Sequence, residues 1–204
     1  MELIWYGHSC FMLDTDLGSV VFDPYEPDNV PGLMLPPLRA DLCLCSHNHR
    51  DHNFSARVEL SGKNCSLSYE GFPSFHDNSQ GALRGENTIH LVRAGDFTAV
   101  HLGDLGHLLS EEVASNLRGA DLLMIPVGGH FTIDAKQAAE TVKLLQPKLV
   151  IPMHYRGEGF GYEAINEVSD FTCLMDKVTV LGTNRLDPTA FSSGTTAVPC
   201  CPLL

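Results

Sequence analysis

Three histidines and one aspartate lie within six consecutive positions, His47-Asn48-His49-Arg50-Asp51-His52. Imidazole and carboxylate groups together are the ligands that suit zinc, iron and manganese ions. Burying this many polar rings without a metal ion or matching hydrogen bonds would cost free energy. The segment therefore predicts a metal site rather than a set of ordinary surface histidines.

The residues around this segment explain how its side chains could converge. Residues 41–45 alternate leucine with polar or small residues and predict a short strand that ends where the histidines begin. Side chains two positions apart in an extended segment point the same way, so His47 and His49 can meet at one cation. Asp51 and His52 are adjacent, and both can face inward only if the chain turns there. One turn could thus supply ligands to two neighbouring metals.

Further candidate ligands follow other predicted strands. His76 comes after an aromatic strand end, and we expect it to be the third ligand of the first metal. Asp104 stands near glycines, where backbone can approach a metal and a carboxylate could bridge two cations. His154 follows the apolar residues 149–153, so several strands should deliver ligands to one rim. Asp23 could cap a turn or orient a ligand histidine through its second nitrogen.

The remaining pattern predicts strands that alternate with helices. Ser110 is the expected N-cap of a helix over 110–118, and Asp134 opens a second helix over 134–146 with a capping box. A shorter helix is expected near 162–168. The expected strands are 2–6, 11–15, 20–22, 41–45, 65–69, 88–92, 97–102, 122–127, 149–153 and 178–181. This order predicts an α/β (α+β) domain in which two sheets have helices outside them.

Length and composition predict a single globular domain. The chain has 204 residues, of which 44% are hydrophobic, enough to bury a sizeable core. We expect this domain to span residues 1–183 and residues 184–204 to form an extended C-terminal tail. The seven cysteines are an odd number, and we interpret them as reduced thiols. Cys43 and Cys45 could form a metal-binding pair, but their alternation with leucines favours packing in the core.

The net charge and the hydropathy of the sequence limit the kinds of partner that we expect this protein to bind. The formal net charge is −12, and no cluster of lysine or arginine offsets it, which argues against nucleic acid. No stretch approaches the ~18 apolar residues that a membrane-spanning helix needs. The first residues lack a basic segment and a cleavage site. We therefore expect a soluble cytoplasmic protein that acts on a small molecule without membrane contact, and homo-oligomerisation is left open.

The order of the candidate ligands resembles that of the metallo-β-lactamase superfamily: His47, His49, Asp51, His52, His76, Asp104 and His154. Four longer segments resemble its small single-domain branch, which is related to L-ascorbate-6-phosphate lactonase: residues 5–11, 101–106, 125–129 and 151–155. The resemblance implies an αββα sandwich of two mixed β-sheets with helices on the outer faces. It also implies a binuclear hydrolytic site.

Within this resemblance, Asp104 would join two sets of ligands: His47, His49 and His76 on one metal, and Asp51, His52 and His154 on the other. The cofactors would be two divalent metal ions, zinc in the first place and manganese or iron as alternatives. A water shared by two cations has a pKa lowered toward neutrality, which makes it a nucleophilic hydroxide. The implied activity is hydrolysis of a small ester, lactone or phosphodiester, with an anionic substrate as one option.

Several residues are candidates for catalysis or for substrate contact. Asp51 would also orient the hydroxide, and His8, His130 or Tyr155 could donate a proton or hydrogen bond to the leaving group or oxyanion. His8 could equally be a turn residue, and His130 could equally face solvent. Arg84 could attract an anionic substrate, although pairing with an acidic neighbour is commoner. A non-hydrolytic iron-binding redox or sensing protein is the competing class, because the same ligands accept iron.

Overall fold

Two β-sheets lie face to face in this computed structural model, which describes residues 1–201. The five-stranded sheet has the spatial order β13 (Arg185–Leu186), β1 (Glu2–Trp5), β2 (Phe11–Thr15), β3 (Gly18–Phe22) and β5 (Leu42–Leu44). The seven-stranded sheet has the order β12 (Val178–Val180), β14 (Thr195–Val198), β11 (Leu149–Met153), β10 (Leu122–Pro126), β9 (Phe97–His101), β8 (Glu86–Ala94) and β7 (Ser68–Phe75). A separate parallel pair joins β4 (Leu38–Ala40) to β6 (Val58–Leu60).

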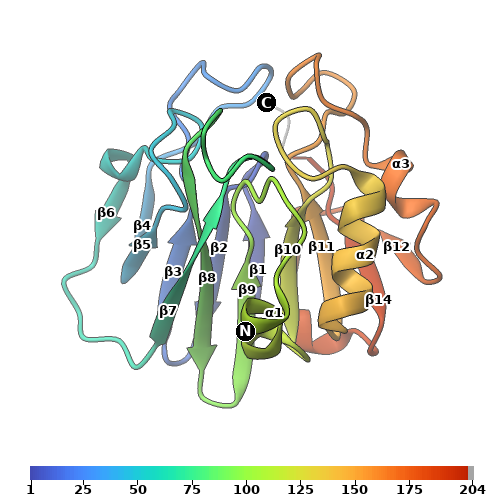
Figure 1. Cartoon of the computed structure of the whole chain (residues 1–204). Helices are drawn as coiled ribbons and strands as arrows, with labels where there is room; N and C mark the ends of the chain where they lie inside the picture. The colour runs from blue at the N-terminus through green and yellow to red at the C-terminus, as the bar shows by residue number, and fades with distance from the viewer. Residues whose placement is uncertain (202–204) are drawn as a thin grey trace.

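The helices belong mainly to the seven-stranded sheet. In Figure 1, α1 (Glu111–Leu117) and α2 (Ala135–Leu145) lie in front of this sheet, and the five-stranded sheet lies behind it. The short helix α3 (Ser169–Thr172) lies near β12, and the 3-10 turns η1 (Ser55–Arg57) and η2 (Pro188–Ala190) complete the elements. Both sheets contain parallel and antiparallel pairs. The predicted sandwich of two mixed sheets is therefore confirmed.

The core explains why the central strands are apolar along their whole length. All five residues of β10 and all five of β11 are buried. A parallel strand covered by helices on one face and by a second sheet on the other has no solvent-facing side, so its sequence does not alternate. The large side chains of Trp5, Phe11 and Phe22 are fully buried and fill the space on the five-stranded side.

The two long helices start where the sequence predicts. The Ser110 side chain accepts a hydrogen bond from the Val113 N–H, and Asp134 forms the expected capping box at the start of α2. The helix expected near 162–168 is wrong, because those residues form turns and α3 begins only at Ser169. Within residues 1–201 no helix is both long enough and apolar enough to cross a membrane.

Tertiary hydrogen bonds explain that wrong helix. The Asn166 N–H donates to the Gly128 carbonyl, and the Asn166 carbonyl accepts from the Arg156 N–H. Backbone groups that bond to neighbouring loops are not available for the i to i−4 bonds of a helix. The apolar spacing of this segment therefore reflects packing against other loops.

The expected boundary between a domain and a C-terminal tail is also wrong for the described residues. β13 pairs antiparallel with β1, and β14 lies between β11 and β12 in the seven-stranded sheet, parallel to both. All four residues of β14 are buried. Its sequence, Thr-Thr-Ala-Val, carries only a weak apolar signal, which is why pattern reasoning missed it. Residues 202–204 lie outside the described part of the chain.

The strand directions bring six strand ends to one edge of the sandwich. In the five-stranded sheet β1, β3 and β5 run in the same direction, because β2 is antiparallel to both β1 and β3, and β5 is parallel to β3. In the other sheet β7, β9 and β11 also share one direction. Each of these six strands leads at its carboxyl end into a candidate site residue. The structure therefore brings the candidate residues to one rim, as the sequence predicts.

Replacing Ala197 tests whether the C-terminal segment belongs to the folded core. Ala197 is fully buried in β14, so Ala197→Asp should lower the free energy of unfolding by about 3 kcal/mol or more, the usual cost of an unpaired buried charge. The matched control Ala190→Asp changes an exposed position of η2 and should have an effect within about 0.5 kcal/mol. Urea denaturation measures both. Equal stability of the two variants would show that the segment around Ala197 lies outside the folded core, as expected for an extended tail.

Candidate metal centre

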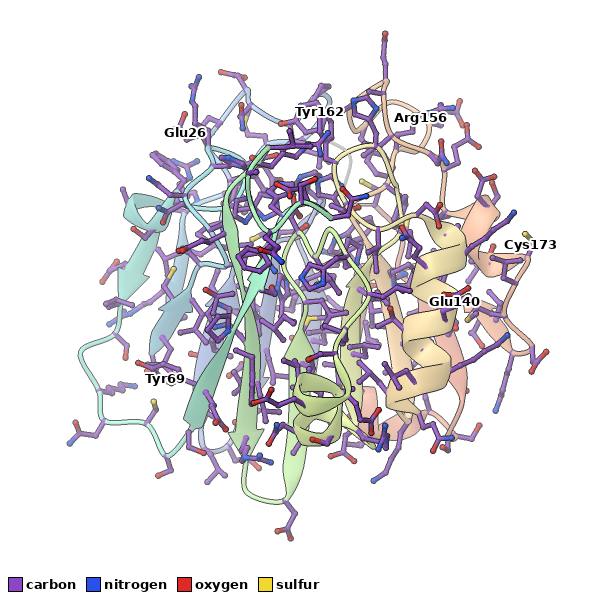
Figure 2. The ribbon with its side chains drawn as sticks, in the orientation of Figure 1. Glu26, Tyr69, Glu140, Arg156, Tyr162 and Cys173 are labelled. Carbon is purple, nitrogen blue, oxygen red and sulfur yellow. The ribbon has the colours of Figure 1, made fainter. Side chains whose placement is uncertain are left out.

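Six strands deliver the candidate ligands and the residue that orients them. The residues that follow the strand ends are His8 after β1, Asp23 after β3, the segment His47 to His52 after β5, His76 after β7, Asp104 after β9 and His154 after β11. Figure 2 shows Tyr162 among the loops at this upper end, whereas Tyr69 lies near the opposite end of the molecule. The predicted ligands are therefore gathered from loops far apart in the sequence.

One oxygen of Asp104 lies at the centre of this cluster. Asp104 Oδ2 is 3.1 Å from His76 Nε2, 3.1 Å from His154 Nε2 and 3.2 Å from His52 Nε2. His47 Nε2 is 4.0 Å from the same oxygen. Burial raises the pKa of Asp104, but the imidazoles of His154 and His52 outweigh it and hold the pKa well below its ordinary value. The carboxylate is thus ionised and faces four imidazoles.

Three groups of side chains bring their donor atoms within 4.8 Å of one another: His47, His49 and His76; His8, Asp51, His52 and His154; and His47, His52 and Asp104. The first group contains the three residues that the sequence assigned to one metal. The second contains the three assigned to the other metal and adds His8, while the third links the two groups through Asp104. Such separations are compatible with ions bound between these groups.

Two of the histidines are oriented by acceptors at their second ring nitrogen. His52 Nδ1 is 2.8 Å from Asp23 Oδ2, and His76 Nδ1 is 3.1 Å from the Phe131 carbonyl oxygen. Carboxylate and carbonyl oxygens only accept hydrogen bonds, so each Nδ1 carries a proton, and each Nε2 would present its lone pair to an ion bound in the cluster. Of the two roles considered for Asp23, orientation of a ligand histidine is the one observed.

Asp23 also orients His47 through a hydroxyl group. The Ser46 side chain donates to Asp23 Oδ2 at 2.7 Å, and the Ser46 backbone N–H donates to Oδ1 at 2.7 Å. Because the Ser46 hydroxyl hydrogen is used in this way, its oxygen accepts from His47 Nδ1, 2.9 Å away. One fully buried carboxylate therefore directs the Nε2 lone pairs of both His47 and His52 into the cluster.

The buried donor atoms fit a divalent metal ion. His47 Nε2, His52 Nε2 and Asp104 Oδ1 are buried and have no hydrogen-bond partner among residues 1–201. Leaving polar atoms unpaired in the interior costs about 1–3 kcal/mol each, so an ion that accepts their lone pairs would remove this cost. Burial, together with the neighbouring His52 imidazole, lowers the pKa of His47 to about 3, so the His47 ring is neutral and free to coordinate.

Three residues with strained backbone lie at the same place. His8, Asp23 and His154 have φ angles of 51°, 43° and 53°, in the left-handed region that residues with a side chain rarely adopt. Each such residue costs of order 1–3 kcal/mol, and it persists only where the surrounding structure holds it. The strain indicates that these positions serve the cluster rather than the stability of the fold.

Two glycines let the Asp104 loop lie against its neighbours. A Cβ at Gly103 would lie 2.5 Å from Ser46 Cβ, and a Cβ at Gly106 would lie 2.3 Å from the Asp77 backbone nitrogen. Both distances are shorter than side-chain contacts allow. The sequence suggested that these glycines let backbone approach a metal. In the structure they instead allow three ligand-bearing loops to pack together.

A cavity of about 370 Å³ opens onto the cluster. Its lining residues are His49, Asp51, His76, Arg84, Asp104, Phe131, His154 and Tyr162. The Tyr162 hydroxyl donates to Asp51 Oδ2 at 3.3 Å. Sequence reasoning missed Tyr162 and Phe131, because neither follows a predicted strand or lies in a ligand-like pattern. Only the folded chain brings these two aromatic rings to the mouth of the site.

Three residues predicted to contact substrate do not line this cavity. Tyr155 is buried against Trp5 and Phe160, with ring centroids 5.5 and 5.9 Å away, because it follows His154 and points the opposite way. His130 is exposed and outside the cluster, with its ring 4.4 Å from that of Phe131. His8 is buried beside Asp51 and His154 and is not among the residues that line the cavity. The geometry therefore does not support these three contacts.

A two-sheet sandwich with a His/Asp cluster at the carboxyl ends of its strands defines a class of metal-binding enzymes. The sequence profile of the β-lactamase superfamily domain matches residues 2–154. A UPF0173 metal-dependent hydrolase of Thermoplasma acidophilum is 30% identical over 189 residues, which cover 76% of this chain and 83% of the relative. The chain belongs to the metallo-β-lactamase superfamily and, within it, to these small metal-dependent hydrolases.

Solved structures agree with this assignment. A protein of Thermotoga maritima, assigned as a zinc-dependent hydrolase of the metallo-β-lactamase superfamily, superposes with a TM-score of 0.74 and 26% identity over 97% of this chain and 98% of its own. Igni18, a metallo hydrolase of Ignicoccus hospitalis, has a TM-score of 0.68 over 100% of this chain and 96% of its own. Its identity of 19% shows a shared fold only.

Removing the Asp23 carboxylate tests its role in orienting the histidines. Asp23→Asn should weaken metal binding about 10–100-fold, because partners of the second ring nitrogen typically contribute that much. Asp121→Asn is the matched control, since Asp121 accepts similar hydrogen bonds from Thr98 far from the cluster. Competition of each purified variant with a chelating dye measures the affinity. Equal affinities for the two variants would show that Asp23 does not orient metal ligands.

Proposed function

We propose that this chain hydrolyses a small anionic ester, lactone or phosphodiester with the help of two divalent cations. The observation that carries the proposal is the arrangement of two groups of donor atoms that meet at Asp104 and border one cavity of about 370 Å³. A cavity of this size suits a small molecule rather than a polymer. It places a substrate directly beside the donor atoms.

The chain's residues would hold the cations in two sets joined by Asp104: His47, His49 and His76 for one, and Asp51, His52 and His154 for the other. Zinc fits this nitrogen-rich donor set, and manganese or iron would also fit it. Two bound cations would supply a hydroxide at neutral pH by lowering the pKa of a water, and would polarise the carbonyl or phosphoryl oxygen. No serine or cysteine nucleophile is then required.

Asp51 would position the attacking water. Its carboxylate lines the cavity, and its Oδ2 accepts a hydrogen bond from the Tyr162 hydroxyl at 3.3 Å. Burial raises the pKa of Asp51, but the neighbouring imidazoles of His8 and His52 hold it below its ordinary value. An ionised carboxylate fixed in this way can accept a hydrogen bond from water and so aim the oxygen lone pair at the substrate.

Tyr162 would turn its single O–H from Asp51 toward the substrate side of the cavity. Burial, with the nearby Asp51 carboxylate, raises the pKa of Tyr162 above its ordinary value. The phenol therefore keeps its proton at neutral pH and is a donor. It would take the role in stabilising the oxyanion or leaving group that the sequence suggested for Tyr155, whose side chain lies in the core.

Arg84 supports the anionic part of the proposal. It is the one lysine or arginine among the residues that line the cavity, and it has no carboxylate partner within 4.0 Å in residues 1–201. One N–H of its guanidinium donates to the His130 carbonyl at 3.1 Å, and the group lies 5.7 Å from the centre of the Phe131 ring. The remaining N–H groups are free to bind a carboxylate or phosphate.

The loop that carries Arg84 is held in place by a buried aspartate. The Asp77 carboxylate accepts hydrogen bonds from the backbone N–H groups of Ser79, Gly81, Leu83 and Arg84. These bonds fix the path of the loop between β7 and β8. The guanidinium is therefore presented to the cavity by an ordered loop, as a specificity-determining residue requires.

Metal content and turnover of the purified protein test the proposed function. Without chelators the protein should retain about two transition-metal ions per chain and hydrolyse members of a panel of esters, lactones and phosphodiesters. Asp51→Ala should abolish turnover while circular dichroism stays unchanged. The control Asp170→Ala changes an exposed carboxylate and should keep full turnover. Fewer than one ion per chain, or bound iron with metal-centred redox chemistry and no hydrolysis, would contradict the proposal.

A matched pair of esters tests the role of Arg84. Arg84→Met should raise KM for the anionic p-nitrophenyl hemisuccinate about tenfold or more, because hydrogen bonds to a charged group contribute about 1.5–3 kcal/mol. KM for the neutral p-nitrophenyl valerate should change by less than about twofold. The control Arg39→Met removes an exposed guanidinium that pairs with Glu59 and should change neither value. Equal losses on both esters would show that Arg84 only shapes the loop.

A further inference from the structure

The proposed reaction leaves the buried His8, which adjoins the second group of donors, unexplained. His8 is 1% exposed, and neither of its ring nitrogens has a hydrogen-bond partner among residues 1–201. It does not line the cavity, so contact with a substrate does not account for it. A buried imidazole without partners costs free energy, and the cost is tolerated only where another group satisfies the ring.

The backbone holds the His8 ring against the second group of donors. The His8 carbonyl accepts hydrogen bonds from Trp5 Nε1 at 3.0 Å and from the His154 N–H at 3.3 Å. These bonds tie the turn after β1 to the loop after β11, and the two imidazole centroids are 4.2 Å apart. Both histidines adopt the strained left-handed conformation. The strained backbone at these two residues thus directs both imidazole rings toward the second group of donors.

The separation between His8 and Asp51 matches that between ligands of one ion. His8 Nε2 is 3.4 Å from Asp51 Oδ2, Asp51 Oδ2 is 3.8 Å from His52 Nε2, and His52 Nε2 is 3.2 Å from Asp104 Oδ2. A hydrogen bond between an imidazolium and a carboxylate is shorter, about 2.7–2.9 Å. Ligands bound at about 2.0–2.2 Å from a common metal lie about 3.0–3.6 Å apart in octahedral or tetrahedral geometry.

We propose that His8 Nε2 is an additional ligand of the cation held by Asp51, His52 and His154. This inference rests on the proposed two-metal function. With His8 as a ligand, the two metal sites have different numbers of ligands. One site has three histidines and the shared Asp104, and the other has four side chains and the same Asp104. The cation beside His8 is then the more tightly held, and open coordination positions for water and substrate lie mainly on its neighbour.

A matched pair of histidine variants tests this ligand. His8→Asn removes the imidazole but keeps a residue that tolerates the left-handed conformation, since φ at His8 is 51°. His130→Asn is the control, because His130 has a φ of 57° and is exposed outside the donor groups. Both variants are titrated with Co²⁺ against a competing chelator, and the visible absorption of bound Co²⁺, which is stronger with fewer ligands, is recorded.

We expect His8→Asn to weaken the tighter of the two binding steps by about tenfold or more and to intensify the absorption of that ion. His130→Asn should match the unchanged protein in both measurements. Unchanged affinities and an unchanged spectrum in His8→Asn would overturn the inference, and His8 would then only donate a hydrogen bond to Asp51. Should His8→Asn not fold, anomalous scattering from Co²⁺ in crystals of the unchanged protein decides instead, and an ion beyond about 2.6 Å from His8 Nε2 overturns it.

These outcomes are separate from failure of the proposed function. If the unchanged protein binds two ions and hydrolyses its substrates while His8→Asn behaves like the control, only the role of His8 is lost. If the unchanged protein binds no ion and turns nothing over, the proposed function and the His8 ligand are both overturned.

Discussion

A buried carboxylate surrounded by imidazoles is the interaction on which the rest of this structure depends. Asp104 is 1% exposed, and one of its oxygens lies within 3.2 Å of the ring nitrogens of three histidines from three different loops. An ionised carboxylate is stable in the interior only when it is paired and fully coordinated. The loops after β5, β7, β9 and β11 must therefore meet at one point, which sets how the two sheets are placed.

The scaffold meets this requirement with rigid elements and with local strain. Strands of one direction deliver the loops, glycines at positions 103 and 106 let those loops touch, and Asp23 fixes the tautomers of two rings through direct and hydroxyl-mediated hydrogen bonds. The left-handed backbone conformation of Asp23 and His154 also helps to direct their side chains into the cluster. These features lower stability locally, and the apolar core between the sheets compensates for them.

The two groups of donors do not face the solvent equally. Of the first group, His49 is exposed, whereas His52 and His154 of the second are fully buried. The cavity, with Arg84, Phe131 and Tyr162 at its wall, is bordered by residues of both groups: His49 and His76 of the first, and Asp51 and His154 of the second. Two ions that share Asp104 would then have different roles. The more deeply buried ion would hold the loops together, and the ion beside the exposed His49 would bind water and substrate.

The sequence by itself determined the ligand types, the strands that precede them and the starts of both long helices. These features are local: the period of apolar residues, the capping residues and the density of histidines after one strand. Only the tertiary structure decided that His8 lies beside Asp51, that Tyr155 points into the core, that Tyr162 reaches the cavity and that residues 195–198 form a buried strand next to the sheet edge. Those outcomes depend on loops that meet from distant parts of the chain, and no local pattern records such contacts.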